Sequence, residues 1–390
     1  MHVIINLQPL LSPLTGIGHY TRELTLELLS RQQGDGLMLE GLTGRVREPL
    51  TADHPLLAGA GGEGAAEAQS PWWQLARRYL RNPLTRRAYR WLYTQRLRAG
   101  AAERDALYWE PNYILLPWRG RSVVTVHDLS HRRYPQYHPP ERVAFFSRQL
   151  GESLARARRI NVVSQFTAQE LVELEGVDPA RIDIVPPAVS SRFLVPLPPA
   201  GREALEARYR LPERYLLSVG TLEPRKNLSR VLEAYGRLPA AVQQRTPLLL
   251  AGMSGWGEQR LSAAAEAALA RGTIRRLGYV PSADLPGLYA RAAGFVYVSL
   301  YEGFGMPVAE AMASGTPVLT ANVTATHEVA GGTALEVAPD DDDAILEGLR
   351  ALIDDDHQER ILAARARAEA FTWQASADRL LASFRQAMID

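Results

Sequence analysis

The sequence predicts an α/β protein of two domains, each a doubly wound parallel sheet. Two domains are expected because 390 residues are too many for one ordinary core and suit two units of roughly 150–200 residues. Short apolar runs alternate with helical segments along most of the chain, as in parallel sheets covered by helices. The proline-dense residues 185–201 can continue neither a helix nor a central strand. We therefore expect an N-terminal domain over residues 1–190 and a C-terminal domain over residues 191–371.

The composition excludes several kinds of chemistry. The chain has no cysteine, so disulfides, thiolate catalysis and cysteine metal sites are excluded. Hydrophobic content is ordinary, and the formal net charge is +1. No run of about 18 apolar residues is present to span a membrane, and the N-terminus enters a strand pattern without a signal peptide. We therefore expect a cytoplasmic protein.

The first strand of the N-terminal domain is expected at residues 3–7, in a short apolar run. Gly16-Ile-Gly18 follows it, and residues 21–30 have helical periodicity. A strand, a Gly-x-Gly turn and a helix can cradle a phosphate. The third glycine of a dinucleotide-binding motif is missing, so a purely structural turn stays open.

A later strand, residues 122–129, ends in the polar pair His127-Asp128. This pair lies at the carboxyl edge of the predicted sheet, where ligands of open α/β sheets bind. A lone histidine after a strand is often structural, so the residues by themselves leave both interpretations open.

Residues 72–98 interleave tryptophan and tyrosine with arginine and contain no acidic residue. This pattern is typical of an amphipathic helix at an anionic membrane surface. A helix with core aromatics and solvated arginines is the structural alternative. A nucleic-acid surface is disfavoured, because nothing else in the chain resembles a nucleic-acid module.

The C-terminal domain begins with a strand at residues 215–220, followed by the loop EPRKN and a helix to about residue 238. The next two strands are expected at residues 246–252 and 274–280. Arg225 and Lys226 stand in the loop, where two cations can neutralise a diphosphate leaving group or remain solvated. Lys226 is the one lysine of the chain, which otherwise uses arginine for every cation.

Residues 294–320 read as a strand, a glycine loop, a short helix and a second strand. Pro307 suits the first helical position, and the helix N-terminus over residues 304–308 is a plausible phosphate site. Glu302 is expected in the loop and Glu310 in the first turn of the helix. The simpler interpretation is that both glutamates are solvated and that Glu310 complements the helix dipole.

The acidic run at residues 340–343 resembles a D-x-D metal motif only superficially, because no further acids or histidines are placed around it. We predict a solvated turn there and a helix over residues 343–353.

The segment E-G-F-G-M-P-V-A-E-A-M-A-S-G-T-P-V resembles the paired-glutamate signature of glycosyltransferase family 4, retaining sugar-nucleotide transferases of the GT-B fold. That fold has two Rossmann-like domains facing a central cleft, and in the family a final helix, here residues 372–390, returns to the N-terminal domain. V-G-T-L-E-P-R-K-N-L resembles the family's diphosphate loop, particularly in its O-antigen mannosyltransferase branch. Many members carry an arginine where this chain has Thr221, which leaves open whether Arg225 takes over its contact.

The resemblance implies roles for individual residues. Glu302 and His127 would contact the transferred sugar, Lys226 the diphosphate and Glu310 the ribose. Catalytic roles would fall to Glu302, His127 and Lys226. Donor binding would fall to Gly16, Gly18, Arg225, Lys226, Tyr279, Val280, Gly303, Phe304, Gly305, Met306, Pro307, Val308 and Glu310.

The resemblance further implies retaining transfer of a hexose, α-mannose from GDP-mannose, to a hydroxyl of a lipid-linked surface polysaccharide. The partners would be the nucleotide sugar, the lipid-linked glycan and an anionic membrane surface contacted by residues 72–98, with no metal or other cofactor and no nucleic acid. The protein would then lie on the inner face of the plasma membrane. A UDP- or dTDP-sugar donor carrying glucose or rhamnose, or a non-catalytic sugar-nucleotide sensor, are the alternatives.

Overall fold

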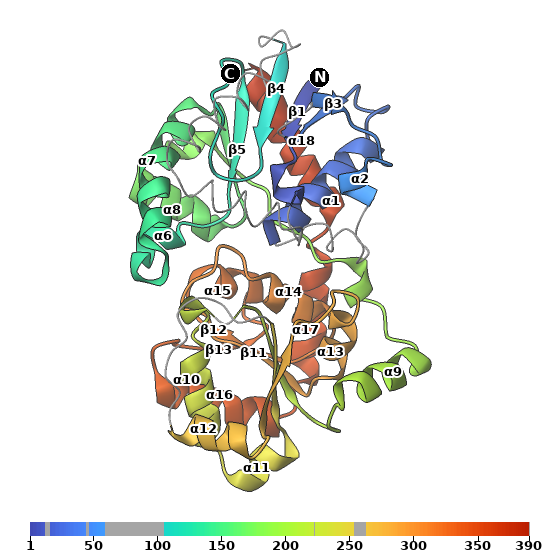
Figure 1. The fold of residues 1–390 in the computed structure, drawn as a ribbon, viewed down its shortest axis with the longest axis vertical. Coiled ribbons are helices and arrows are strands. Elements are labelled where there is room, and N and C mark those ends of the chain that lie inside the picture. The colour runs from blue at the N-terminus through green and yellow to red at the C-terminus, as the bar shows by residue number, and fades with distance from the viewer. Residues whose placement is uncertain (12–15, 44–46, 59–104, 222, 253–262, 390) are drawn as a thin grey trace, which may run out of the picture.

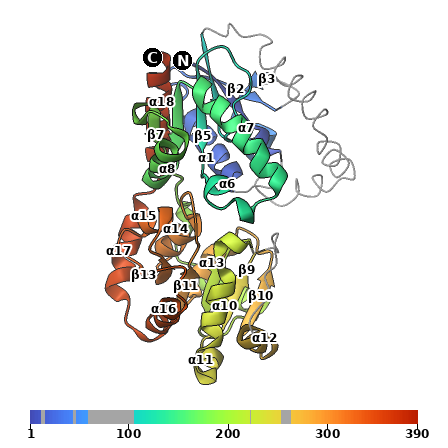
Figure 2. The ribbon, with the colours of Figure 1, turned by 90° about the vertical axis from the view of Figure 1, so that its left-hand side faces the viewer.

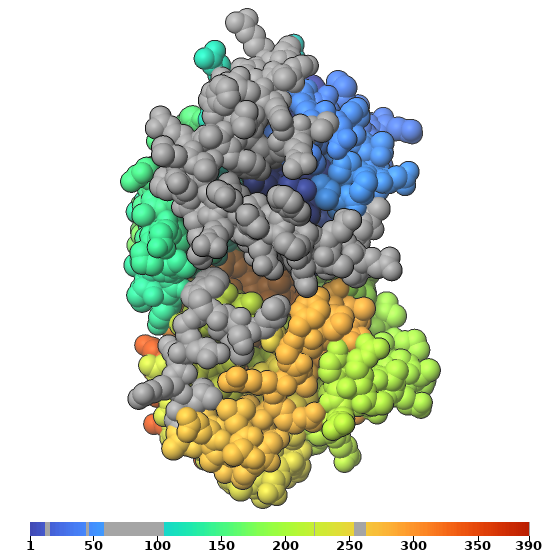
Figure 3. Space-filling model, viewed as in Figure 1, coloured from blue at the N-terminus to red at the C-terminus, as the bar shows by residue number. Residues whose placement is uncertain are grey.

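The computed structural model describes residues 1–11, 16–43, 47–58, 105–221, 223–252 and 263–389. It contains two parallel-sheet α/β domains, the first coloured mainly blue to green and the second mainly yellow to orange (Figure 1). In the space-filling view they form an upper and a lower lobe (Figure 3). The predicted fold class is confirmed.

The N-terminal sheet has the strand order β3-β2-β1-β4-β5-β6-β7, and only the edge strand β3 runs antiparallel to its neighbour. Strands β4 and β5 are buried along their whole length, which explains their apolar composition. The strands are β1 (His2–Asn6), β2 (Met38–Leu42), β3 (Arg47–Pro49), β4 (Ala106–Glu110), β5 (Ser122–Val126), β6 (Arg159–Val162) and β7 (Ile182–Ile184).

The C-terminal sheet is parallel throughout and has the order β10-β9-β8-β11-β12-β13. Its chain order reverses between β8 and β11, and the loops that leave two such strands enclose the crevice where ligands of this architecture bind. The strands are β8 (Leu216–Val219), β9 (Leu248–Ala251), β10 (Ile274–Gly278), β11 (Gly294–Tyr297), β12 (Val318–Ala321) and β13 (Leu335–Val337).

Helices cover both sheets. Those of the N-terminal half are α1 (Gly16–Ser30), α2 (Pro55–Ala58), α6 (Ser130–Arg133), α7 (Pro140–Arg156) and α8 (Gln165–Glu175). Those of the C-terminal half are α9 (Pro199–Tyr209), α10 (Leu228–Gly236), α11 (Ala240–Arg245), α12 (Ala263–Ala270), α13 (Leu285–Arg291), α14 (Met306–Ala313), α15 (Thr324–Ala330), α16 (Asp342–Asp354) and α17 (Gln358–Glu369). Short 3-10 turns are η1 (Gln8–Leu10), η2 (Pro135–Tyr137), η3 (Pro179–Arg181), η4 (Ser191–Phe193) and η5 (Pro224–Lys226).

The last helix, α18 (Trp373–Ile389), packs against the N-terminal sheet. Ser383 Oγ donates a hydrogen bond of 2.7 Å to Oδ1 of the buried Asn161 on β6. Phe384 meets Trp109 of β4 edge to face, with 5.7 Å between ring centroids. In the side view the helix ends beside the N-terminus (Figure 2). The chain therefore crosses between the domains twice.

Two helices begin earlier than the sequence predicted. Helix α1 begins at Gly16, so Gly16 and Gly18 lie in its first turn and not in a loop before it. The buried Gly18 and Tyr20 extend its apolar face toward the N-terminus. Helix α14 begins at Met306, because Gly305 adopts the left-handed conformation, with φ +103°, that ends the loop. Pro307 is consequently near but not at the first position.

Among the described residues, no helix is long and apolar enough to cross a membrane. The arginine- and aromatic-rich residues 72–98 lie outside the described residues.

Candidate active site

The loops that follow β8 and β11 bring three charged side chains together. Lys226 Nζ lies 2.6 Å from Oε1 of Glu302, and a guanidinium nitrogen of Arg225 lies 3.1 Å from Oε2. Glu302 is only 8% exposed, so the carboxylate is held between two cations away from water. The residues expected at the sugar and at the diphosphate are thus neighbours in space.

Two residues that the sequence analysis missed complete this cluster. Tyr297 Oη and Ser299 Oγ each donate a hydrogen bond of 2.8 Å to Oε1 of Glu302. Lys226 Nζ also contacts Tyr297 Oη and lies 5.0 Å from the centre of the tyrosine ring. The sequence did contain a signal for these two residues: Tyr297 ends the apolar strand β11, and Ser299 follows it. Buried polar groups need hydrogen-bond partners, so two of them at this point predict a polar site nearby.

The charges of this cluster shift one another's protonation. Burial alone would raise the pKa of Glu302, but Lys226 and Arg225 lower that pKa to about 2. Burial lowers the pKa of Lys226, with Glu302 opposing the effect and Arg225 adding to it. Glu302 is therefore an ionised carboxylate at every pH at which the protein would work.

The glycine loop touches the other domain. A Cβ atom at Gly303 would lie 1.8 Å from the main-chain oxygen of His127 and 2.9 Å from Asp128 Cβ. Thr167 Oγ1 also donates a hydrogen bond of 3.3 Å to Gly303 O. Only a residue without a side chain lets the loop after β11 meet the loop after β5 so closely.

Not all expected phosphate-binding amides are available in this loop. Pro307 has no N–H, and the amide of Val308 donates a hydrogen bond of 2.9 Å to Gly305 O. Phe304 is buried and meets Phe371 edge to face, at 5.4 Å between centroids. Main-chain donors for a phosphate therefore have to come from residues 303–306.

Glu310 lies in the second turn of α14, because the helix begins at Met306; its expected place in the first turn was wrong. Its Oε2 accepts a hydrogen bond of 3.1 Å from Tyr289 Oη on α13. Burial raises the pKa of Glu310 to about 7, while Tyr289 and Arg192 oppose the effect. Glu310 is thus half-buried and hydrogen-bonded to Tyr289, and a pKa of about 7 means that it loses its proton near neutral pH.

His127 follows β5 and is held from three sides. Its Nε2 lies 2.8 Å from the main-chain oxygen of Pro111, so Nε2 carries the proton and donates it, because a carbonyl can only accept. The rings of Tyr20 and Tyr113 meet it edge to face, at 5.1 and 5.7 Å between centroids. Burial lowers the pKa of His127, with Pro111 and Asp128 opposing. The imidazole is therefore neutral, and Nδ1 is left as its acceptor for a hydroxyl.

Comparisons with known proteins agree with this architecture. Residues 53–193 match the family model described as Glycosyltransferase Family 4, and residues 202–369 match Glycosyl transferases group 1. The O-antigen chain mannosyltransferase B of Escherichia coli is 37% identical over 378 residues, covering 96% of this chain and 97% of that protein. The chain belongs to glycosyltransferase family 4.

Solved structures place the enzyme in the GT-B fold. Sucrose-phosphate synthase from Thermosynechococcus elongatus superimposes with a TM-score of 0.68 at 19% identity, over 99% of this chain and 98% of that one. WaaG, a glycosyltransferase involved in lipopolysaccharide biosynthesis, gives 0.63 at 17% identity, over 97% and 98%. The recognised family, the GT-B fold and glycosyltransferase activity are therefore confirmed.

The remaining expected donor contacts lie on elements around the cluster. Tyr279, 71% exposed, and the buried Val280 follow the carboxyl end of β10. Gly16 is exposed and Gly18 buried at the start of α1. Burial has the largest effect on the pKa of His19 in α1 and on that of Glu310 in α14, and the positive charge of Arg192, in η4, acts to lower both. Because one side chain is close enough to affect both residues, the start of α1 lies near α14. The donor contacts of these residues stay predictions.

Thr221, at the position where many relatives carry arginine, is exposed and donates a hydrogen bond of 2.8 Å to Glu223. The guanidinium of Arg225 instead contacts Glu302 and the main-chain oxygen of Tyr301. The enzyme thus has two cations at the loop without the family arginine.

Polar contacts across the domains hold this site closed. Tyr301 Oη accepts a hydrogen bond of 2.8 Å from the amide of Leu129 and contacts the buried carboxylate of Glu170. The carboxylate of Glu328 on α15 accepts from the first two amides of α8, Gln165 and Phe166, each at 2.9 Å. A carboxylate at a helix N-terminus is favourable because the helix presents unpaired N–H groups there.

The acidic run forms a turn and the start of α16, one residue earlier than predicted. Asp341 accepts hydrogen bonds from the amides of Asp343 and Ala344 at the start of α16, at 3.0 and 2.9 Å. Asp342 pairs with Arg230 and Asp343 with Arg237, each at 2.6 Å. Across the described part of the chain, no group of three or more acidic or histidine side chains is placed to hold a metal.

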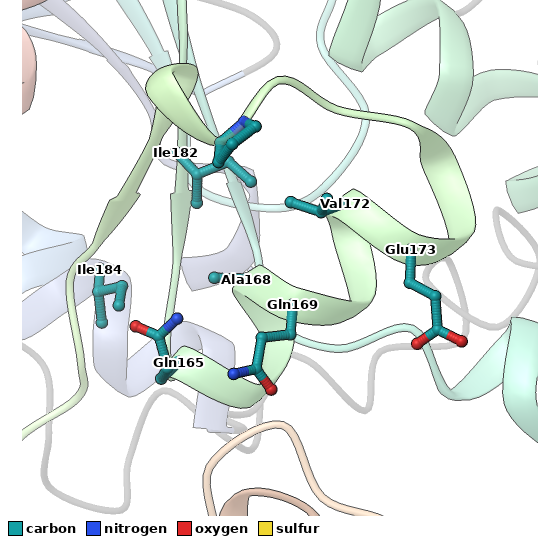
Figure 4. Close-up of a pocket in the computed structure, with 8 residues that line it drawn as sticks. Gln165, Ala168, Gln169, Val172, Glu173, Ile182 and Ile184 are labelled. Carbon is teal, nitrogen blue, oxygen red and sulfur yellow. The ribbon is translucent and has the colours of Figure 1, made fainter.

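A cavity of about 530 Å³ lies away from this cluster, between α8 and the edge strand β7 (Figure 4). Ala168, Val172, Ile182 and Ile184 give it an apolar floor, and Gln165, Gln169 and Glu173 stand around it. None of these residues was predicted for the site, and none belongs to the charged cluster.

Proposed function

We propose that the enzyme transfers α-mannose from GDP-mannose, with retention of configuration, to a sugar hydroxyl of a lipid-linked surface polysaccharide. The observation that carries this proposal is the ionised Glu302, held between Lys226 and Arg225 beside the glycine loop. The resemblance to a mannosyltransferase over nearly the whole chain supports mannose as the sugar.

In this proposal the two cations stabilise the departing diphosphate. The bond between the anomeric carbon and the phosphate oxygen breaks as positive charge develops on the sugar, and fixed opposite charges lower the energy of such a transition state. The acceptor oxygen attacks from the face that the diphosphate leaves, and its proton passes to the leaving phosphate oxygen. No separate general base is required.

Glu302 and His127 would act on the sugar. The carboxylate is ionised and buried, so it can stabilise positive charge at the anomeric carbon without first losing a proton. The neutral His127 would accept a sugar hydroxyl at Nδ1. The position of both residues where the domains meet fits a sugar bound between the domains.

The test is transfer by the purified enzyme to a mannose-terminated acceptor, with GDP-mannose, UDP-glucose and dTDP-rhamnose as parallel donors. We expect release of GDP and an α-linked product by NMR, and almost none with Glu302→Gln. Transfer from only the UDP- or dTDP-sugar would reject the donor, and a β-linked product would reject retention. Donor binding without release of nucleotide would favour the sensor.

Residues 72–98 extend the proposal to the membrane. Their arginines would hold a cytoplasmic enzyme peripherally on the inner leaflet, since each basic residue near an anionic surface contributes about 1 kcal/mol. Sedimentation with anionic and neutral vesicles tests this. Replacing Arg86, Arg87 and Arg90 with Ser should release the protein from anionic vesicles, and unchanged binding would reject the proposal.

A further inference from the structure

A second cavity, of about 430 Å³, lies between the two domains beside the charged cluster. Tyr137 of η2 and Tyr134, which directly precedes η2, line it from the N-terminal domain. Pro224, Asn227, Arg230 and Asp340 line it from the C-terminal domain. Its volume is within the roughly 300–1,000 Å³ typical of small-molecule sites.

The two tyrosines bring parallel aromatic rings to the cavity. Their rings are parallel within 5°, with 5.7 Å between centroids. Stacked rings touch at roughly 3.5–4.0 Å between planes, so a centroid separation of 5.7 Å means that the two rings are displaced from direct overlap. Both side chains are half-buried, and the ring of Tyr134 also rests edge to face on Tyr301, at 5.8 Å.

The opposite wall carries fixed polar groups. Arg230 donates to Asp340 O at 2.9 Å and pairs with Asp342 at 2.6 Å, which holds its guanidinium in place. Asn227 is anchored by a hydrogen bond of 2.6 Å to Pro339 O. The carboxylate of Asp340 is exposed. This wall thus presents the Arg230–Asp342 ion pair and, beside it, the further carboxylate of Asp340.

We propose that this cavity binds a neutral pyranose unit of the acceptor glycan, one or more residues away from the hydroxyl that is glycosylated. The negative face of a tyrosine ring attracts the weakly positive C–H groups on one face of a sugar, and the polar wall provides partners for its hydroxyls. A nucleotide is disfavoured, because the exposed carboxylate of Asp340 would repel its phosphates. This inference rests on the proposed function, which supplies a glycan as the acceptor.

The cavity is connected to the reaction site through both of its walls. Pro224 begins η5, the turn that carries Arg225 and Lys226. Tyr134 Oη lies 3.5 Å from the main-chain oxygen of Leu300, two residues before Glu302. A glycan bound here would contact both domains, so a long acceptor would bind more tightly than a short one.

The test compares α-mannobiose with α-mannopentaose as acceptors for wild type, Tyr137→Ala and Tyr137→Phe. We expect Tyr137→Ala to raise the KM for the pentaose about tenfold, equivalent to about 1.4 kcal/mol, without changing the KM for the biose or for the donor. Tyr137→Phe keeps the ring and should behave as wild type. Phe145→Ala, an aromatic truncation on α7 outside the cavity, is the matched control.

An unchanged KM for the pentaose in Tyr137→Ala, or an equal rise in the donor KM, would overturn the inference. Asp340→Ala alters an exposed residue and should raise the same KM if Tyr137→Ala does not fold. If no donor supports transfer, the proposed function fails, and calorimetric titration with α-mannopentaose still decides. Binding that Tyr137→Ala or Asp340→Ala abolishes would support the cavity; absence of binding to wild type would reject it.

Discussion

Lys226 Nζ lies 2.6 Å from Oε1 of Glu302, and this contact joins the loop after β8 to the loop after β11. Glu302 is buried, Lys226 is half-buried, and Tyr297 Oη contacts both partners. Because it links the residue expected at the diphosphate to the one expected at the sugar, a change in either should affect both binding and turnover.

Replacing Lys226 should separate charge from shape. Lys226→Arg keeps the cation but not the compact ammonium, so we expect kcat/KM for the donor to fall at least about tenfold with little change in Tm. Lys226→Met leaves Glu302 with Arg225 as its one cation and should cost about 1.5–3 kcal/mol of folding free energy. Steady-state kinetics and thermal unfolding measure the two effects. Wild-type kinetics in Lys226→Arg would contradict the assignment.

The single lysine also permits a chemical test. An acylating reagent meets only two kinds of amine, the N-terminus and Lys226. Labelling of Lys226, read by peptide mass, should inactivate the enzyme, and GDP-mannose should protect it. Arg245→Lys places a control lysine at a surface position whose native side chain is 58% exposed, and its labelling should not respond to the donor.

Glu302 should contribute to stability only above acidic pH. Its pKa is lowered from an unfolded value of about 4.3 to about 2, so the contribution is complete above about pH 5 and is lost as the pH falls toward 2. Urea unfolding across this window should show a steeper loss of stability for wild type than for Glu302→Gln. Parallel curves for the two proteins would show that the ion pair does not stabilise the fold.

Glu310 should give the donor reaction a pH dependence near neutrality. With a pKa of about 7, the carboxyl is protonated below that pH and cannot accept two ribose hydroxyls as a carboxylate does. We expect kcat/KM for the donor to rise about tenfold per pH unit up to pH 7 and then level off. Glu310→Gln should lower the plateau and remove this limb.

The same raised pKa has the opposite effect on folding. The folded state holds the Glu310 proton more tightly than the unfolded state, so the free energy of unfolding should decrease as pH rises from about 4.3 through 7. Glu310→Gln should be less sensitive over this range. If the rise of kcat/KM with pH persists in Glu310→Gln, the titrating group is not Glu310.

Gly303→Ala should prevent the domains from meeting. The added methyl would lie 1.8 Å from His127 O, so we expect transfer to fall at least about a hundredfold while nucleotide binding persists. Gly151→Ala is the matched control, because nothing lies within 4 Å of a Cβ there and it sits inside α7. Calorimetry with GDP and turnover assays separate the two steps. Normal turnover in Gly303→Ala would show that this closed contact is not needed.

Turnover should persist after exhaustive chelation. The proposal gives the diphosphate two cations and main-chain amides in place of a divalent ion. Activity that EDTA abolishes and magnesium or manganese restores would overturn this prediction. Zinc added back to the chelated enzyme serves as a control for nonspecific metal effects.

Much of the fold could be predicted because a buried parallel strand is a short, continuous run of apolar residues in the sequence. The apolar residues 246–252 contain β9, and the run that begins at Ser122 forms β5. The glycine loop and Glu302 could be predicted equally well, because the glycines and the glutamate lie at fixed spacing within one continuous segment.

The partners of those residues were not visible in the same way. Tyr301 and Glu170 are 131 residues apart and meet only after both domains have folded and docked. Tyr289 reaches Glu310 from another helix, and no periodicity links the two. The shift of Glu310 to the second turn came from the conformation of one glycine, Gly305, which a sequence pattern fixes only to within a residue or two.

The two segments that cross between the domains are bonded to each other. The amide of Val189 donates a hydrogen bond of 3.0 Å to Phe371 O, and Ser376 Oγ donates one of 2.7 Å to Pro186 O. In topological terms the C-terminal domain is an insertion into the N-terminal domain, and two adjacent chain segments connect them. Two connecting segments that are hydrogen-bonded to each other restrict sliding and twisting of one domain against the other more than bending. We therefore expect the two domains to separate by a rotation about an axis through Val189 and Phe371.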